Sequence, residues 1–167
     1  MTTIREATAA DAGLISHIHA TSWRKDYRSL IAGDYLDRLP DNYWVPSVQA
    51  WLSGGQVSGL LILEDGKPVG ACLYGRSRDE AYADWGEVIS LYLLPEATRR
   101  GLGGQLLEEA MRLMREDGHE RFYLWAIEGN TAAEAFYRRH GFRPTEEKVC
   151  YQIGGQDVVD VRYIRET

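Results

Sequence analysis

Segments with strand-like and helix-like hydrophobic patterns alternate along this chain. Seven short apolar runs have the length of β-strands and lie at residues 3–7, 57–63, 68–75, 85–94, 121–127, 148–153 and 157–164. Apolar positions recur at helical spacing in an interrupted region, 11–54, and in two later segments, 103–116 and 130–140. Short turns join the second run to the third and the sixth to the seventh, which indicates antiparallel neighbours. The pattern predicts an α+β fold in a single domain over residues 1–167.

The run at 85–94 combines an apolar pattern with one acidic residue. A regular strand there would share one face among its alternating residues, which are Glu87, Ile89, Leu91 and Leu93. The strand leads directly into a glycine-rich segment, PEATRRGLGGQLL, at 95–107.

This glycine-rich segment has the features of an anion-binding loop. It opens into the helical pattern at 103–116, and the first N–H groups of a helix have no acceptor inside that helix. Glycines allow a ligand close to the main chain, and Arg99 and Arg100 suit phosphate. The order of the glycines fits neither the dinucleotide pattern GxGxxG nor a phosphate loop ending in Gly-Lys. We therefore predict a diphosphate-bearing ligand, with a turn carrying two solvated arginines as the alternative.

The composition is that of a soluble globular protein with negative charge. Of the 167 residues, 44% are hydrophobic and 26% are charged, and the formal net charge is −6. The negative charge argues against nucleic-acid binding and favours a cationic partner. The first residues lack a basic flank before an apolar core, and no apolar run approaches about 18 residues. We expect a cytoplasmic protein without a membrane span.

Cysteines and histidines show no metal-binding spacing. Cys72 and Cys150 lie in strand-like apolar runs without a CxxC partner, so we expect both to be reduced core residues. The histidines show neither HExxH spacing nor a neighbouring cysteine. No metal site is therefore expected.

Three short sequences occur in an informative order. Glu87 precedes LYLLP, RRGLGG occupies 99–104, and GNTAAEAFYRRHGF occupies 129–142. Together they resemble the acyl-CoA binding core of the GNAT N-acetyltransferase superfamily, and the opening IREATAADA resembles its first strand and helix. The resemblance implies a mixed, mostly antiparallel sheet of about seven strands with a central splay, flanked by about four helices.

By this resemblance, the chain binds acetyl-CoA largely through its backbone. Leu91 and Leu93 offer main-chain groups to the pantetheine arm, and Leu94 lies at the diphosphate end. The residues implied for the diphosphate are Arg99, Arg100, Gly101, Leu102, Gly103 and Gly104. Thr98 stands where the family usually has Gln or Arg, which predicts at most a weaker affinity. Asn130 matches a cofactor-binding asparagine of the family, with a simple helix cap as the alternative.

The resemblance also implies how the reaction is catalysed. Tyr137 matches the family's proton donor to the leaving thiolate and also belongs to the cofactor site, unless it is only a half-buried aromatic. Glu87 is the candidate base, directly or through water, unless it only orders the acceptor or solvent. Direct attack of a primary amine on the thioester in a ternary complex is the implied reaction.

The sequence leaves the acceptor open. A small cationic amine is favoured by aromatic and acidic residues, namely Trp23, Tyr27, Tyr35, Tyr82, Trp85, Asp26, Asp34 and Asp84. An antibiotic, an amino acid and a protein N-terminus are alternatives, the last of which would make the chain a protein N-terminal acetyltransferase. A catalytically silent acyl-CoA-binding or sensor module is another functional class. A homodimer through edge strands or the C-terminal hairpin would use Tyr151, Val159 and Tyr163.

Overall fold

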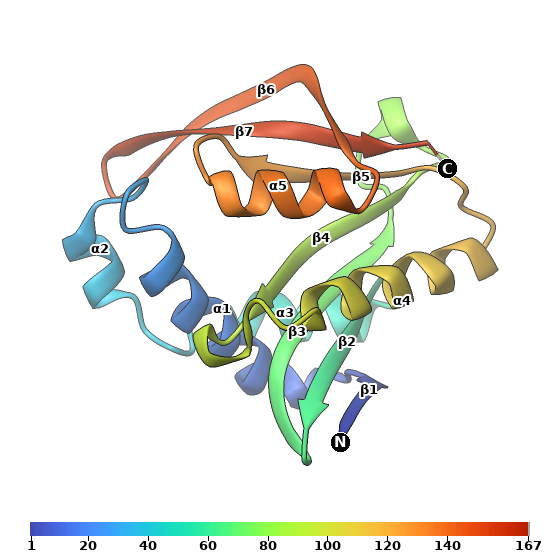
Figure 1. Ribbon diagram of the computed structural model, residues 1–167, viewed down its shortest axis with the longest axis horizontal. Coiled ribbons are helices and arrows are strands. Elements are labelled where there is room, and N and C mark those ends of the chain that lie inside the picture. The colour runs from blue at the N-terminus through green and yellow to red at the C-terminus, as the bar shows by residue number, and fades with distance from the viewer. Residues whose placement is uncertain (167) are drawn as a thin grey trace.

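The computed structural model describes residues 1–166 and contains one seven-strand sheet with helices on both faces (Figure 1). The strands are β1 (Thr2–Glu6), β2 (Val57–Glu64), β3 (Lys67–Arg76), β4 (Gly86–Leu93), β5 (Phe122–Ile127), β6 (Arg143–Ile153) and β7 (Gln156–Arg165). They lie in the order β1-β2-β3-β4-β5-β7-β6, and only β4 and β5 pair in parallel. The mixed, mostly antiparallel sheet predicted from the sequence is confirmed.

Five α-helices and three short 3-10 turns complete the described residues. The helices are α1 (Ala12–Asp26), α2 (Gly33–Arg38), α3 (Val45–Gly54), α4 (Leu102–Glu116) and α5 (Thr131–Arg139). The turns are η1 (Ala9–Asp11), η2 (Glu80–Tyr82) and η3 (Pro95–Ala97). About four helices were expected, and the difference lies in the interrupted N-terminal region, where α2 is only six residues long.

Helix α4 covers the face of the sheet opposite to α1 and α3 (Figure 1). Its apolar stripe is fully buried and consists of Leu106, Leu107, Ala110, Met111 and Met114. A glycine on β3, Gly70, permits this close packing, because a Cβ there would lie 3.2 Å from Leu106. Burial of each large side chain of the stripe stabilises the fold by about 1.5–3 kcal/mol.

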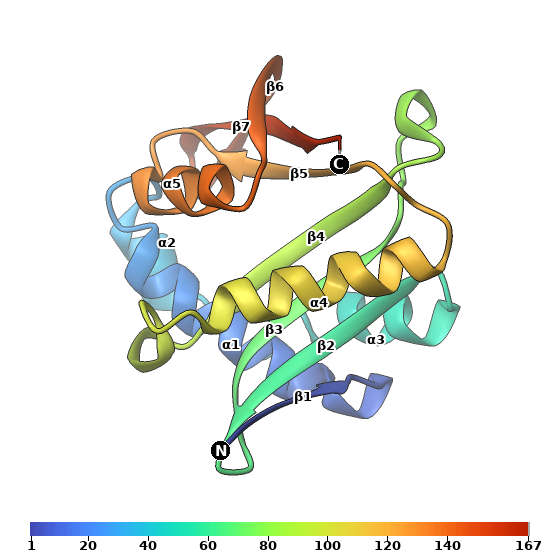
Figure 2. The ribbon, with the colours of Figure 1, turned by 45° about the vertical axis from the view of Figure 1, so that its right-hand side comes forward.

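The two central strands diverge after a short parallel ladder. Only Gly86, Glu87 and Val88 of β4 pair with β5, opposite Phe122, Tyr123 and Leu124. Beyond this point β4 and β5 separate, with α4 below and α5 above the opening in Figure 2. The central splay that the family resemblance implied is therefore present.

A β-bulge at Ile89 changes which residues of β4 share a face. Leu73 of β3 pairs with Ser90, whereas the next residue, Tyr74, pairs with Val88. Ile89 is thus the extra residue. One inserted residue moves every following side chain to the other face of the strand.

The expectation that Glu87 shares a face with Leu91 and Leu93 is therefore wrong. Gly86 faces α4, because a Cβ there would lie 2.6 Å from Met114, so Glu87 points to the opposite face. Ser90, beyond the bulge, also points there. The bulge therefore gives Glu87 and Ser90 a common face, on the side of α1.

Strand β6 forms one edge of the sheet, and most of its side chains are exposed. Cys150 lies on this strand and is exposed, so the expectation that it is a core residue is wrong. Cys72, on β3, is fully buried as expected. No helix within residues 1–166 combines the length and apolar composition needed to cross a membrane.

Candidate active site

The loop between β4 and α4 presents a row of backbone donors. Among residues 1–166, the N–H groups of 99–104 have no backbone acceptor, and no side chain caps α4. Two residues in the row have positive φ, Arg99 at 63° and Gly101 at 81°. These groups lie at the N-terminus of a 15-residue helix, where the helix dipole favours an anion.

The glycines of this loop have two different structural roles. A Cβ on Gly101 would meet nothing within 4 Å, so this position is open to a ligand. In contrast, a Cβ on Gly104 would lie 2.8 Å from the His140 ring, and one on Gly103 would lie 3.4 Å from Phe136. Gly103 and Gly104 therefore let α4 pack closely against α5, a role that the sequence pattern alone did not reveal.

The two arginines of the loop differ in their surroundings. Arg100 forms an ion pair with Glu64 at the end of β2. Arg99 is exposed and has no ion pair within the described residues. Arg99 is therefore the cation of the two that is available to a phosphate.

The inner edge of β4 supplies further backbone groups. Beyond Val88 no residue of β4 pairs with β5, so Leu91 and Leu93 lie along an edge that is free for a ligand. Leu94 differs, because its N–H donates to Val69 at 2.8 Å and its carbonyl accepts from Ala97 at 2.9 Å. Both backbone groups of Leu94, which we expected to contact the cofactor, are therefore already hydrogen-bonded within the chain.

Helix α5 faces the same opening from above (Figure 2). Asn130 is its N-cap and accepts a hydrogen bond from the Ala133 N–H at 3.3 Å. Asn130 therefore serves as a helix cap, which was the alternative to a cofactor-binding role. Tyr137 lies seven residues later, about two turns along nearly the same helix face, and packs edge-on against Phe136 and Phe142. Burial raises the pKa of the Tyr137 phenol, and Tyr92 of β4 acts in the same direction. The phenol is thus neutral at physiological pH.

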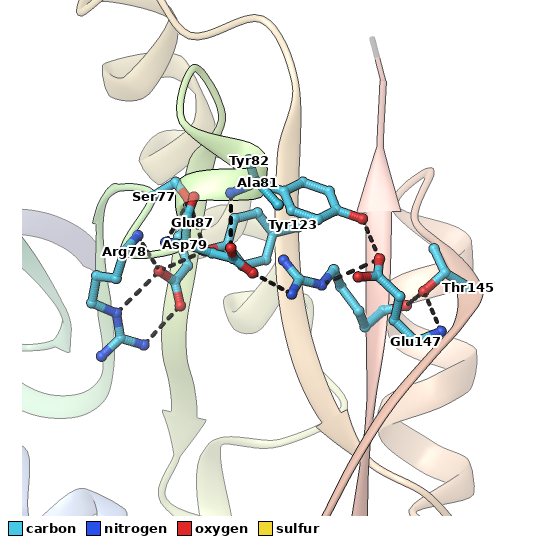
Figure 3. Close-up of polar contacts among 10 residues, drawn as sticks. Ser77, Arg78, Asp79, Ala81, Tyr82, Glu87, Tyr123, Thr145 and Glu147 are labelled. Carbon is cyan, nitrogen blue, oxygen red and sulfur yellow. Dashed lines mark hydrogen bonds and ion pairs between the residues drawn. The ribbon is translucent and has the colours of Figure 1, made fainter.

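Glu87 lies at the closed end of the splay in a dense polar network (Figure 3). Its side chain is 3% exposed and accepts hydrogen bonds from Arg78 at 2.7 and 3.1 Å. Tyr123 of β5 donates to the same carboxylate at 3.0 Å, and the Arg78 backbone N–H donates at 3.2 Å. Both oxygens of this carboxylate therefore accept hydrogen bonds from other groups of the same chain.

A buried cation, Arg162, lies next to this network. The Arg162 guanidinium lies 4.0 Å from the Tyr82 ring, 4.4 Å from Trp125 and 4.7 Å from Tyr123. It also donates to Asp79 at 2.6 Å. The aromatic surface at this end of the molecule is thus occupied by an arginine of the chain itself.

The aromatic residues expected around the acceptor therefore belong to two separate clusters. Tyr82 and Trp85 pack with Tyr123 beside Arg162. Trp23, Tyr27 and Tyr35 pack instead with the α1–α2 segment and the far ends of β5 and β7. Only the second group borders the open part of the splay, through contact with Tyr92.

Sequence patterns did not indicate several residues of this site. Arg78 and Tyr123 reach Glu87, and Arg162 reaches Tyr123, only because β3, β4, β5 and β7 pair in a particular register. Within residues 1–166, no cluster of three or more histidine, cysteine or acidic side chains could hold a metal ion.

Comparison with known proteins agrees with this geometry. The model of the acetyltransferase (GNAT) family matches residues 17–142. The uncharacterized N-acetyltransferase YuaI of Bacillus subtilis is 32% identical over 84% of this chain and 79% of its own length. The spermidine N(1)-acetyltransferase of Thermoplasma acidophilum is 26% identical over 84% of this chain and 87% of its own length. The crystal structure of the PaiA N-acetyltransferase from Thermoplasma acidophilum in complex with coenzyme A superimposes with a TM-score of 0.78, at 20% identity over 100% of this chain and 99% of that one.

These matches place the chain in a defined class of transferases. The chain belongs to the acetyltransferase (GNAT) family. It is an N-acetyltransferase with the α+β fold of that family.

Proposed function

We propose that this protein transfers the acetyl group of acetyl-CoA to a primary amine of a small polycationic acceptor of the polyamine class. The observation that carries the proposal is the pairing of two unsatisfied backbone surfaces, the edge of β4 beyond Val88 and the N–H groups of 99–104. One suits an extended amide-containing arm and the other suits a diphosphate, and both occur in coenzyme A.

The chain's own residues fit this ligand. Gly101 is open to close approach, and the exposed Arg99 supplies charge next to the free N–H groups. Thr98 uses its hydroxyl to close the turn after β4, because it donates to the Pro95 carbonyl at 2.8 Å. The diphosphate would therefore depend on the backbone and on Arg99 rather than on the side chain of Thr98. The amide nitrogen of Asn130 could add a contact from α5.

The reaction requires one proton to leave the amine and one to reach the sulfur. Tyr137 holds a neutral phenol on α5 and would donate a hydrogen bond to the leaving sulfur. Since a raised phenol pKa makes full proton loss unfavourable, the proton that Tyr137 gives must be replaced from the attacking nitrogen. The main-chain N–H near Leu91 would polarise the thioester carbonyl.

Glu87 acts in this scheme from the opposite face of the sheet. Its carboxylate is held by Arg78 and Tyr123, so it takes the proton that an acceptor ammonium loses before the attack only through water, or after Arg78 moves. If neither occurs, Glu87 is no base and instead orders the acceptor or solvent in the splay. Both roles place the acceptor on the α1 face and the thioester on the α5 face.

Three observations support a polycationic acceptor. The chain carries a net charge of −6, its acceptor face contains aromatic side chains with Asp26 and Asp160 close enough to act on Tyr92, and a relative 26% identical to it is a spermidine acetyltransferase. The proposal is tested by measuring thiol release with acetyl-CoA and a panel of polyamines, amino acids, amino sugars and peptide N-termini. Turnover should be fastest with a polyamine. Tight coenzyme A binding without turnover on any amine would instead indicate a silent binding or sensor module.

A further inference from the structure

Asp160 is a half-buried carboxylate, and no cation among residues 1–166 forms an ion pair with it. Its only hydrogen-bond partner within the described residues is the Tyr151 hydroxyl, at 3.1 Å. Two other carboxylates that are withdrawn from solvent each have a guanidinium, since Glu87 pairs with Arg78 at 2.7 Å and Asp11 pairs with Arg5 at 2.9 Å. A negative charge in a partly dry position without a counter-charge is costly, and a ligand cation would relieve that cost.

The sheet places this carboxylate on the acceptor face. Asp160 on β7 pairs with Ile127 on β5, and directly paired residues share a face of the sheet. Ile127 packs with Tyr27 at the end of α1 and with Tyr92 of β4. Tyr92 therefore lies on β4, which borders the open splay, and Asp160 lies on β7, next to the other bordering strand β5, both on the side away from α4 and α5.

The groups around Asp160 are aromatic and neutral. Tyr27 and Tyr92 share a hydrogen bond at 3.3 Å. Burial raises the pKa of both phenols, and the negative charge of Asp160 raises both further. Arg162, two residues along β7, does not neutralise Asp160, because its guanidinium pairs with Asp79 and lies against three aromatic rings.

We propose that Asp160, with Tyr151, binds a non-reacting ammonium group of the acceptor and so makes a second positive charge the basis of substrate selection. This proposal rests on the proposed acetyl transfer to amines. The reacting nitrogen itself must be neutral to attack the thioester, and a carboxylate beside it would hold it as an ammonium. Asp160 therefore suits the distant ammonium of a diamine or polyamine, and its role is substrate specificity.

The test compares two amines that differ only in the second charge. Initial rates at saturating acetyl-CoA would be measured with putrescine and with butylamine for the wild type, Asp160→Asn and Asp157→Asn. Asp157 is a matched control, because it is exposed on the same hairpin and accepts only from Gln152. We expect Asp160→Asn to raise KM for putrescine about tenfold, with kcat and the butylamine kinetics unchanged, and Asp157→Asn to match the wild type.

The same variant has a readout that does not depend on turnover. Burial raises the pKa of the Asp160 carboxyl, so its ionised form costs stability at neutral pH, and this cost declines as the pH falls through the raised pKa and is gone below the ordinary pKa of about 3.9. Asp160→Asn should therefore raise Tm at pH 7, which also shows that the variant folds. Calorimetric titration with putrescine should show binding that weakens about tenfold in Asp160→Asn.

The outcomes separate the two proposals. An equal loss of kcat with putrescine and butylamine would overturn the role of Asp160 in specificity and assign it to proton transfer. Unchanged putrescine affinity in Asp160→Asn would also overturn it, while turnover of amines by the wild type would leave the proposed function intact. Putrescine binding that depends on Asp160, in a protein that turns over no amine, would contradict only the proposed transfer.

Discussion

The Glu87 carboxylate and the Arg78 guanidinium form a bidentate ion pair, with Nη2 at 2.7 Å and Nε at 3.1 Å from its oxygens. The pair raises the pKa of Arg78, because the hydrogen bonds to Glu87 favour the charged guanidinium. Glu87 is buried whereas the Arg78 side chain is 48% exposed, so the arginine is the member that can move. The candidate base is thus shielded by a half-exposed cation of the same chain.

Removal of this cation should destabilise the protein. Arg78→Gln leaves a buried carboxylate without its counter-charge, and we expect a loss of about 1–2 kcal/mol in the free energy of unfolding, after allowance for the solvent exposure of the arginine. Urea denaturation would measure it. Arg76→Gln is the matched control, since Arg76 is exposed two residues earlier, at the end of β3, and it should change stability little. Equal stability of both variants would show that the ion pair contributes nothing.

The phenol of Tyr137 should matter for turnover and not for binding. Tyr137→Phe keeps the ring that packs against Phe136 and Phe142 but removes the proton donor. We expect kcat to fall about 100-fold or more, while the Kd for acetyl-CoA from calorimetry stays near that of the wild type. Tyr43→Phe, at an exposed tyrosine, serves as the control. A Tyr137→Phe enzyme with full activity would refute the assignment.

A substitution at Gly101 should weaken coenzyme A binding if the loop of residues 99–104 holds the diphosphate. Its φ is 81°, so Gly101→Ala costs about 1 kcal/mol in backbone strain and places a methyl group on the open side of the loop. Gly118→Ala is a matched control, because Gly118 has a φ of 97° and equally open surroundings at the other end of α4. We expect similar losses of stability in both variants. Only Gly101→Ala should weaken coenzyme A binding in calorimetry, and equal affinity in the two would remove this loop from the site.

His19 should make the stability depend on pH. Burial lowers the pKa of His19 to about 3, and its ring contacts Ser90 at 3.1 Å and the Tyr92 ring edge-on. Between about pH 6.5 and pH 3 the unfolded chain binds the additional proton, so stability is full above this window and falls within it. The expected slope is about 1.4 kcal/mol per pH unit. Urea denaturation at pH 7, 6 and 5 should show this slope in the wild type and its loss in His19→Gln. The same slope in both proteins would contradict a neutral, buried His19.

The sequence predicted the parts of the fold that depend on local pattern. The change from alternating to helical periodicity located the loop of residues 95–107, and the Gly154-Gly155 pair located the last hairpin, where both glycines have positive φ. The pattern did not indicate the bulge at Ile89, because an apolar strand remains apolar when one residue is inserted. The pattern also did not indicate the partners of Glu87, because Arg78 and Tyr123 come close to it only through the register in which the strands pair.

A sequence pattern also does not show where in the sheet a strand lies or which aromatic residues pack together. A strand at the edge of a sheet and a strand in its centre can carry the same apolar pattern, so the pattern did not show that Cys150 is exposed. Tyr82 and Tyr27 have the same side chain, but Tyr82 lies in the cluster beside Arg162 and Tyr27 lies in the cluster of the α1–α2 segment, a separation that residue type does not show.

The most direct test of the account is a single incubation of the purified protein with acetyl-CoA and an equimolar mixture of spermidine and butylamine, followed by mass spectrometry of the products. The account predicts N-acetylspermidine as the main product, with one free coenzyme A formed for each acetyl group transferred. A mixture dominated by acetylated butylamine, or coenzyme A release without any acetylated amine, would contradict it.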